Sequence, residues 1–155
     1  MASARQLRIT FLFALVMLTA QFLLGMAVNL FVTIPDQHPG ANPPEYFSGV
    51  VQSVTWAILH GHILLAIHGG FGLVIVIAAL GTLVQAIGNR RRGIVVSAVV
   101  GFIGVLAAGF NGGSFLNYNQ DFSSMLMAAG FAIAIVSYSV GLYIASDPAG
   151  SRSAA

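Results

Sequence analysis

Four long stretches of the chain carry no charged side chain, and they determine the secondary structure that we expect. They cover residues 9–35, 46–89, 93–120 and 122–146. A helix needs roughly 20 apolar residues to cross a hydrocarbon core about 30 Å thick. The first, third and fourth stretches each suit one membrane span. The second is long enough for either one helix or two.

The arginines decide between these two possibilities, because membrane insertion retains positively charged loops on the cytoplasmic side. With four spans, Arg5, Arg8, residues 90–92 and Arg152 all fall on one side of the membrane. With five spans, residues 90–92 would be translocated. The sequence therefore predicts an all-α fold, a four-helix transmembrane bundle with both termini cytoplasmic. It forms a single integral membrane domain over residues 1–155, with spans at 9–34, 57–88, 94–113 and 123–146.

The predicted second helix is long, and a cap covers the outer face of the bundle beside it. Counting back from Arg90 puts the outer edge of the hydrocarbon near His68. Residues 46–66 therefore either extend this helix or lie along the membrane interface, where Trp56 would be favoured. The segment before them contains four prolines and is expected to be extended rather than helical. Residues 109–122 mix aromatic residues with Asn and Gly and are expected to form an outer turn.

Small residues at helical spacing mark the expected contacts between helices, because association in lipid depends on close backbone approach. Gly101 and Gly104 belong to such a stripe in the third span, and Gly130 and Gly141 belong to one in the fourth. The stripes could also form a seam between copies of the chain, but we favour contacts within one chain. Gln21, near the centre of the first span, is expected to bond to another helix.

The composition agrees with a membrane protein and excludes several classes of function. Hydrophobic residues make up 57% of the chain, charged residues 6%, and the mean hydropathy is +0.90. Soluble domains carry about 25% charged residues. Six arginines against four acids give too little positive charge for nucleic-acid binding. The absence of cysteine excludes disulfides and thiolate chemistry. We expect a multi-pass protein of the bacterial inner (plasma) membrane, with lipid, other membrane subunits or further copies of itself as partners.

The polar residues of the outer end supply the candidate chemistry. In the four-span topology every histidine lies there, together with three of the four acids. Imidazole is the commonest metal ligand, and ionisable groups within membranes are usually functional. Each histidine could instead be a hydrogen-bonded structural residue. The candidate cofactor-binding residues are His60, His68 and His62, and the candidate metal ligands are His38, Asp36 and Asp121.

Helix geometry separates the histidines of the second span. On a regular helix, His60 and His62 point about 200° apart, so they cannot share one ion. His60 and His68 lie on one broad face, about 12 Å apart along the axis. We therefore expect His60 and His68 to matter more for cofactor binding than His62. The two aspartates would complete a metal site or orient an imidazole.

The stretch His60-Gly-His62-Ile-Leu resembles the His-x-His-Leu helix of haem-bearing subunits related to haem–copper oxidases and nitric oxide reductases. Small four-helix bacterial membrane proteins carry similar stretches. The resemblance covers about a dozen residues and implies haem ligation by His60 or His62. The chain departs from the pattern because no other predicted helix contains a histidine. A second axial ligand would have to come from His38, a methionine or another subunit.

Together these features favour an accessory membrane subunit that holds a haem or a metal ion near its outer face, in redox or metal handling. Two alternatives stay open. The chain could be a structural or assembly subunit of a membrane complex without a cofactor, or an oligomeric channel for small solutes. No catalytic residue is identified, so the sequence does not decide whether the protein is an enzyme.

Overall fold

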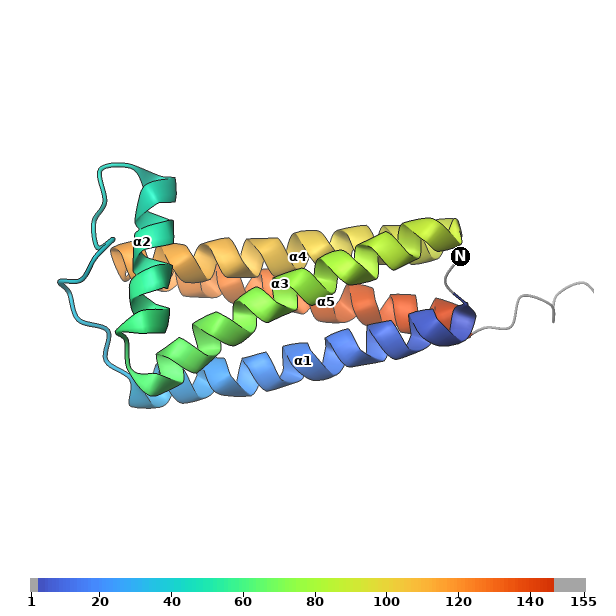
Figure 1. Cartoon of the computed structure of the whole chain (residues 1–155), viewed down its shortest axis with the longest axis horizontal. Helices are drawn as coiled ribbons and strands as arrows, with labels where there is room; N and C mark the ends of the chain where they lie inside the picture. The colour runs from blue at the N-terminus through green and yellow to red at the C-terminus, as the bar shows by residue number, and fades with distance from the viewer. Residues whose placement is uncertain (1–2, 147–155) are drawn as a thin grey trace, which may run out of the picture.

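Five α-helices make up the part of the chain that the structure describes, residues 3–146. In this computed structural model, the helices are α1 (Ala4–Phe31), α2 (Tyr46–Leu59), α3 (Ile63–Asn89), α4 (Arg92–Tyr118) and α5 (Asp121–Ser146). The four longer helices lie side by side, and α2 lies across one of their ends (Figure 1). Arg152, which contributed to the predicted topology, lies outside the described residues.

The helices α1, α3, α4 and α5 are the described helices that are long and apolar enough to cross a membrane. Each has 26 to 28 residues. At about 1.5 Å per residue they are roughly 40 Å long, which exceeds a hydrocarbon core of about 30 Å. Large apolar side chains such as Leu23, Ile77 and Val136 are more than half exposed on their outward faces. Such surfaces suit contact with lipid, so the chain is a helical membrane protein.

The chain runs back and forth between two ends of the molecule. One end, which we call the arginine end, holds the start of α1 and the short connection from α3 to α4, with Arg5, Arg8 and Arg90. This connection is a tight turn. Arg90 takes a left-handed conformation (φ 61°), and its N–H donates to Ile87 O at 3.2 Å. The opposite end, which we call the cap end, carries α2.

Glycines bring α4 and α5 closest together. A Cβ added to Gly104 of α4 would lie 2.7 Å from the carbonyl oxygen of Gly130 and 2.8 Å from the backbone nitrogen of Ala134, both in α5. The ring of Tyr138, which is 1% exposed, fills the space beside Gly101. The small-residue stripes therefore form contacts within the chain, as predicted.

The expected long second helix over residues 57–88 is wrong, because the chain leaves helical conformation between Leu59 and Ile63. A continuous helix would project far beyond the other three, whereas the break lets α2 turn and lie across the end of the bundle (Figure 1), where it contacts α3 and α4. The predicted cap is therefore a separate helix with the loop before it. This loop, residues 32–45, contains no helix, as the four prolines predicted.

The expected outer turn over residues 109–122 is also wrong, because α4 continues to Tyr118 and α5 begins at Asp121. Asn111 does not break the helix. Its side-chain Nδ2 donates to Ala107 O one turn earlier, at 2.8 Å. The turn shrinks to two residues, and Asn119 takes the left-handed conformation that ends α4. The extra turns of α4 provide the surface on which the cap rests.

The contact at Gly104 leads to a first prediction. Gly104→Ala should lower the free energy of unfolding in detergent by about 1–3 kcal/mol, because the methyl group meets rigid backbone of α5. Gly109→Ala on the same helix is the matched control, since nothing lies within 4 Å of an added Cβ there. Unfolding by titration with a denaturing detergent measures both. Equal stability of the two variants would contradict the close contact.

Candidate functional site

Several side-chain hydrogen bonds join separate segments at the cap end, where α2 packs against the last turns of α4. We call residues 32–62 the cap. The hydroxyl of Tyr46 lies 2.6 Å from Ser114 Oγ on α4. Val50 occupies the space beside Gly113, where an added Cβ would lie 2.7 Å from its side chain. These contacts fix α2 across the end of α4.

The buried side chain of Asn117, which is 1% exposed, joins α4 to the cap. Its Oδ1 lies 2.7 Å from Ser53 Oγ. When the amide is rotated by 180°, Nδ2 lies 3.1 Å from Gly49 O and 3.2 Å from Gly40 O, and Oδ1 accepts from Val50 N at 3.2 Å. We adopt the rotated orientation because it gives both ends of the amide partners of the right kind. One α4 side chain thus bonds both the loop and α2.

The loop approaches α2 at positions where only glycine fits. Gly40 has a φ of +90°, which side chains disfavour, and an added Cβ would lie 2.5 Å from Ser53 N. Gly49 of α2 packs directly under the ring of Pro43, and a Cβ added there would lie 3.0 Å from the side-chain amide of Asn117. Residues without side chains therefore let the loop, α2 and Asn117 meet at one point.

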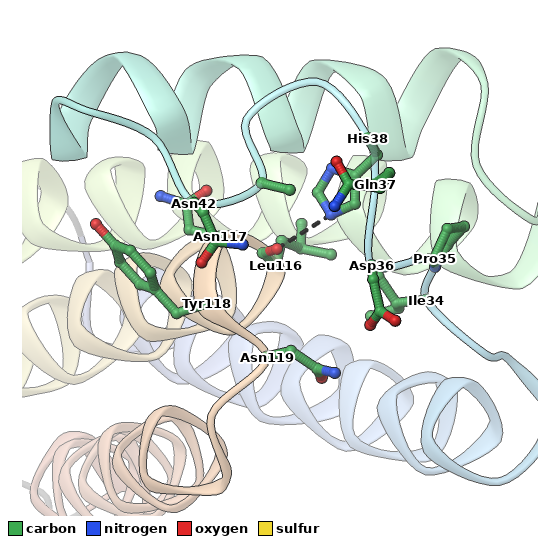
Figure 2. A pocket seen from close by; sticks show the side chains of 11 residues that line it. Ile34, Pro35, Asp36, Gln37, His38, Asn42, Leu116, Asn117, Tyr118 and Asn119 are labelled. Carbon is green, nitrogen blue, oxygen red and sulfur yellow. Dashed lines mark hydrogen bonds between the residues drawn. The ribbon is translucent and has the colours of Figure 1, made fainter.

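His38, a predicted metal ligand, instead fastens the loop to α4 and α2. Its Nε2 lies 3.1 Å from Leu116 O, as Figure 2 shows, and its Nδ1 lies 3.0 Å from Pro39 O. The ring stacks on Trp56 with centroids 4.3 Å apart and planes inclined by 12°. Because both nitrogens lie beside carbonyl oxygens, a metal ion could bind His38 only by displacing one of these contacts.

The carboxylate of Glu45 caps the N-terminus of α2. It accepts hydrogen bonds from Ser48 N at 2.6 Å and Phe47 N at 2.9 Å. These two backbone donors, Ser48 first, hold the pKa of the Glu45 carboxyl below its ordinary value, because they stabilise the charged form. Glu45 thus serves α2 as a helix cap.

The two histidines of the resemblance lie in the connection between α2 and α3. His60 ends α2, and its N–H donates to Trp56 O at 2.8 Å. His62 is the N-cap of α3, where its Nδ1 accepts from Leu64 N at 3.2 Å. Both are exposed. The regular-helix geometry that separated them in the sequence analysis therefore does not apply. Gly61 lies between them. A Cβ added there would lie only 2.5 Å from Ala57 O, so a side chain would not fit at this position.

His68 lies apart from these two, on the face of α3 that meets α1. Gln21 Nε2 donates to His68 O at 3.1 Å and lies 3.4 Å from His68 Nε2, so the prediction that Gln21 bonds to another helix is confirmed. An amide nitrogen only donates, which leaves Nε2 as the acceptor and assigns the ring proton to Nδ1. Within the described chain, His68 Nδ1 and Gln21 Oε1 are buried without a partner.

The predicted metal ligands come together only in part. Asp36 and His38 line the same cavity, but Asp121, the first residue of α5, does not. Among residues 3–146, no group of three or more histidine, aspartate or glutamate side chains could hold a metal ion. His38 was predicted only as a metal ligand, and both its stacking on Trp56 and the pairing of Asn117 with Ser53 were missed by the sequence analysis. The only signal for Asn117 in the sequence was its polar side chain in a largely apolar stretch, eight positions after Gly109.

We compared the chain with protein-family models, curated proteins and solved structures, and found no match in any of the three. The resemblance of residues 60–64 to haem-bearing subunits thus gains no support from a wider similarity.

Asn117 gives the second prediction. Asn117→Leu should speed amide hydrogen exchange across residues 40–53 and cost about 1–3 kcal/mol of local stability, because Gly49, Ser53 and Val50 lose their buried partner. The amides around Gly104 should keep their protection. Asn111→Ala is the control, because the Asn111 side chain bonds only to its own helix. Unchanged exchange in residues 40–53 would show that Asn117 does not hold the cap.

The Glu45 cap gives a pH dependence. Its pKa is lower in the folded protein than in the unfolded chain. The carboxylate therefore stabilises α2 above the unfolded value, and this stabilisation is lost as the pH falls through the folded value. Exchange at the first turn of α2 should accelerate on acidification in the wild type. In Glu45→Gln it should be fast already at neutral pH and respond less to acid. A variant that kept the wild-type pH profile would refute the assignment.

Proposed function

We propose that the four long helices form a four-helix transmembrane bundle in the bacterial inner (plasma) membrane, with both termini in the cytoplasm and the cap on the outer face. The distribution of charge supports this orientation. Arg5, Arg8 and residues 90–92 lie at the arginine end, whereas the charged residues described at the cap end are all acidic, namely Asp36, Glu45 and Asp121. Positive charge is retained on the cytoplasmic side during insertion.

Within this topology, the chain acts as a structural or assembly subunit of a membrane complex and needs no bound cofactor. The observation that carries the proposal is that the polar side chains of the cap form hydrogen bonds that hold the cap itself together. Asn117, His38 and Glu45 each bond to backbone and hold the loop and α2 in place. A rigid, polar surface held at a fixed position above the membrane is what an accessory subunit offers to a partner.

A second candidate, a subunit that binds haem or a metal ion, is favoured by one specific observation. His68 Nδ1 is buried without a partner beside α1, and ligation there requires the other tautomer, with the proton on Nε2, at the cost of the contact with Gln21 Nε2. However, the described residues do not form a complete ligand set around His68, and His60 lies in the exposed connection before α3. Further ligands would have to come from another subunit. The sequence-based expectation that His60→Ala and His68→Ala release a cofactor while His62→Ala retains it belongs to this candidate.

The size of the native particle and its spectrum test the two candidates together. Extracted in mild detergent from its own membrane, the chain should migrate with other proteins, in a particle that whole-number multiples of 16.2 kDa do not explain. The particle should carry no haem absorbance and no stoichiometric metal that depends on His68. A particle made only of this chain would reject the subunit proposal and favour the channel alternative. A Soret band or metal lost in His68→Ala would select the second candidate.

A further inference from the structure

A cavity of about 340 Å³ opens between the loop of the cap and the C-terminal end of α4. Figure 2 shows its wall, with Asp36 and His38 on the loop side and Asn117 and Asn119 on the helix side. Its volume lies at the lower end of the roughly 300–1,000 Å³ that small-molecule sites occupy.

The walls of this cavity are held in place without a ligand. The His38 ring lies between Leu116 O and Pro39 O, and the neutral imidazole donates its one N–H to one of these carbonyls. Asn42 N donates to Asn117 O at 2.8 Å, which ties the far side of the loop to α4. Since the loop is anchored at both points, the cavity is preformed, and a ligand would not have to order the loop on binding.

Two independent features make the cavity attractive to a positive charge. Asp36 is the only formally charged residue of the lining, and its carboxylate has no hydrogen-bond or ion-pair partner among the described residues. The helix side of the wall is the last turn of α4, which contains no basic residue. The carbonyl end of a helix carries a partial negative charge and favours cations. The arginines of the described residues lie at the start of α1 and at the connection from α3 to α4, at the opposite end of the molecule.

The rest of the lining separates an organic cation from a bare metal ion. Gln37, Asn42 and Asn119 contribute carboxamides, which accept hydrogen bonds, and Ile34, Pro35 and Leu116 contribute apolar surface. The described residues here supply one carboxylate, too few anionic ligands for a metal site. A primary ammonium group has three donors for the oxygens, and a short carbon chain would meet the apolar wall.

We propose that this cavity binds a small primary amine, with Asp36 as the counter-ion and the end of α4 completing the negative field. The amine could be a free molecule or the ethanolamine headgroup of a lipid, because both present the same ammonium group. The site is independent of the proposed function as a subunit.

Trp56 provides the measurement, because it is the only tryptophan of the chain and stacks on His38 in the cavity wall. Ethanolamine is titrated into the full-length protein in maltoside micelles, and Trp56 fluorescence is followed. We expect a saturable change with a half-saturation on the order of 1 mM or tighter, weakened by added salt. Ethylene glycol, the uncharged counterpart, should give no saturable change.

Matched variants assign the effect to the cavity. Asp36→Asn keeps the size and shape of this exposed side chain but removes its negative charge. It should weaken ethanolamine binding at least tenfold. Asp121→Asn removes an acid of the same end that does not line the cavity, and it should leave binding unchanged. A normal melting temperature for both variants shows that they fold. Saturable binding that is equal in wild type and Asp36→Asn, or no saturable binding to wild type, would overturn the proposal.

Nanodiscs distinguish the two sources of the amine. Discs of phosphatidylglycerol are compared with discs that also contain phosphatidylethanolamine, without free amine. An Asp36-dependent change of Trp56 fluorescence on adding phosphatidylethanolamine supports a lipid headgroup. Binding of free ethanolamine with no such change supports a soluble amine. Equal responses to ethanolamine and to ethylene glycol would reject an ammonium site of either kind.

Discussion

Helices in hydrocarbon gain little from burying apolar side chains against each other, because the lipid is equally apolar, and they associate where backbones can come close. In this chain that condition is met at Gly104 and Gly130, where α4 and α5 touch backbone to backbone. The contact fixes the position of α4 relative to the other helices. Since α4 continues to Tyr118, it also fixes the surface on which α2 and the loop rest. The geometry of the cap therefore depends on glycines that lie several turns away from it.

Polar groups are treated differently in the two parts of the molecule. In the cap, where backbone is irregular, Asn117, His38 and Glu45 each satisfy backbone groups that helices leave open. Along the long helices backbone groups are satisfied internally. Thr10 Oγ1 of α1 donates to Gln85 Oε1 of α3 at 3.0 Å, and Gln21 with His68 forms a second polar contact between these helices. That pair leaves a donor and an acceptor unmet. The cap is thus a completed structure, whereas the Gln21–His68 pair keeps capacity for a further partner.

The sequence predicted those features that depend on composition along the chain, and it missed those that depend on distant partners. Four apolar helices, the non-helical proline loop and the glycine contacts of α4 and α5 all follow from hydropathy, proline content and spacing. The break before α3 was missed because His62 caps the helix through its ring nitrogen. Histidine is not one of the usual N-cap residues, so the sequence gives no sign of a helix start there. Asn117 was missed because its partners lie more than sixty positions earlier. The haem and metal assignments rested on residue type, predicted position and a short resemblance, and they stay predictions.

The central claim is that the cap is an outer-face structure built on four membrane-spanning helices. Single cysteines test it directly, because the chain has none of its own. Gln37→Cys lies in the exposed loop of the cap, and Gly88→Cys lies near the end of α3, where an added side chain meets nothing within 4 Å. The measurement is labelling of intact cells with a membrane-impermeant maleimide, before and after permeabilisation. The account predicts that position 37 reacts in intact cells and position 88 only after permeabilisation. Reaction of position 88 in intact cells, with position 37 protected, would contradict it.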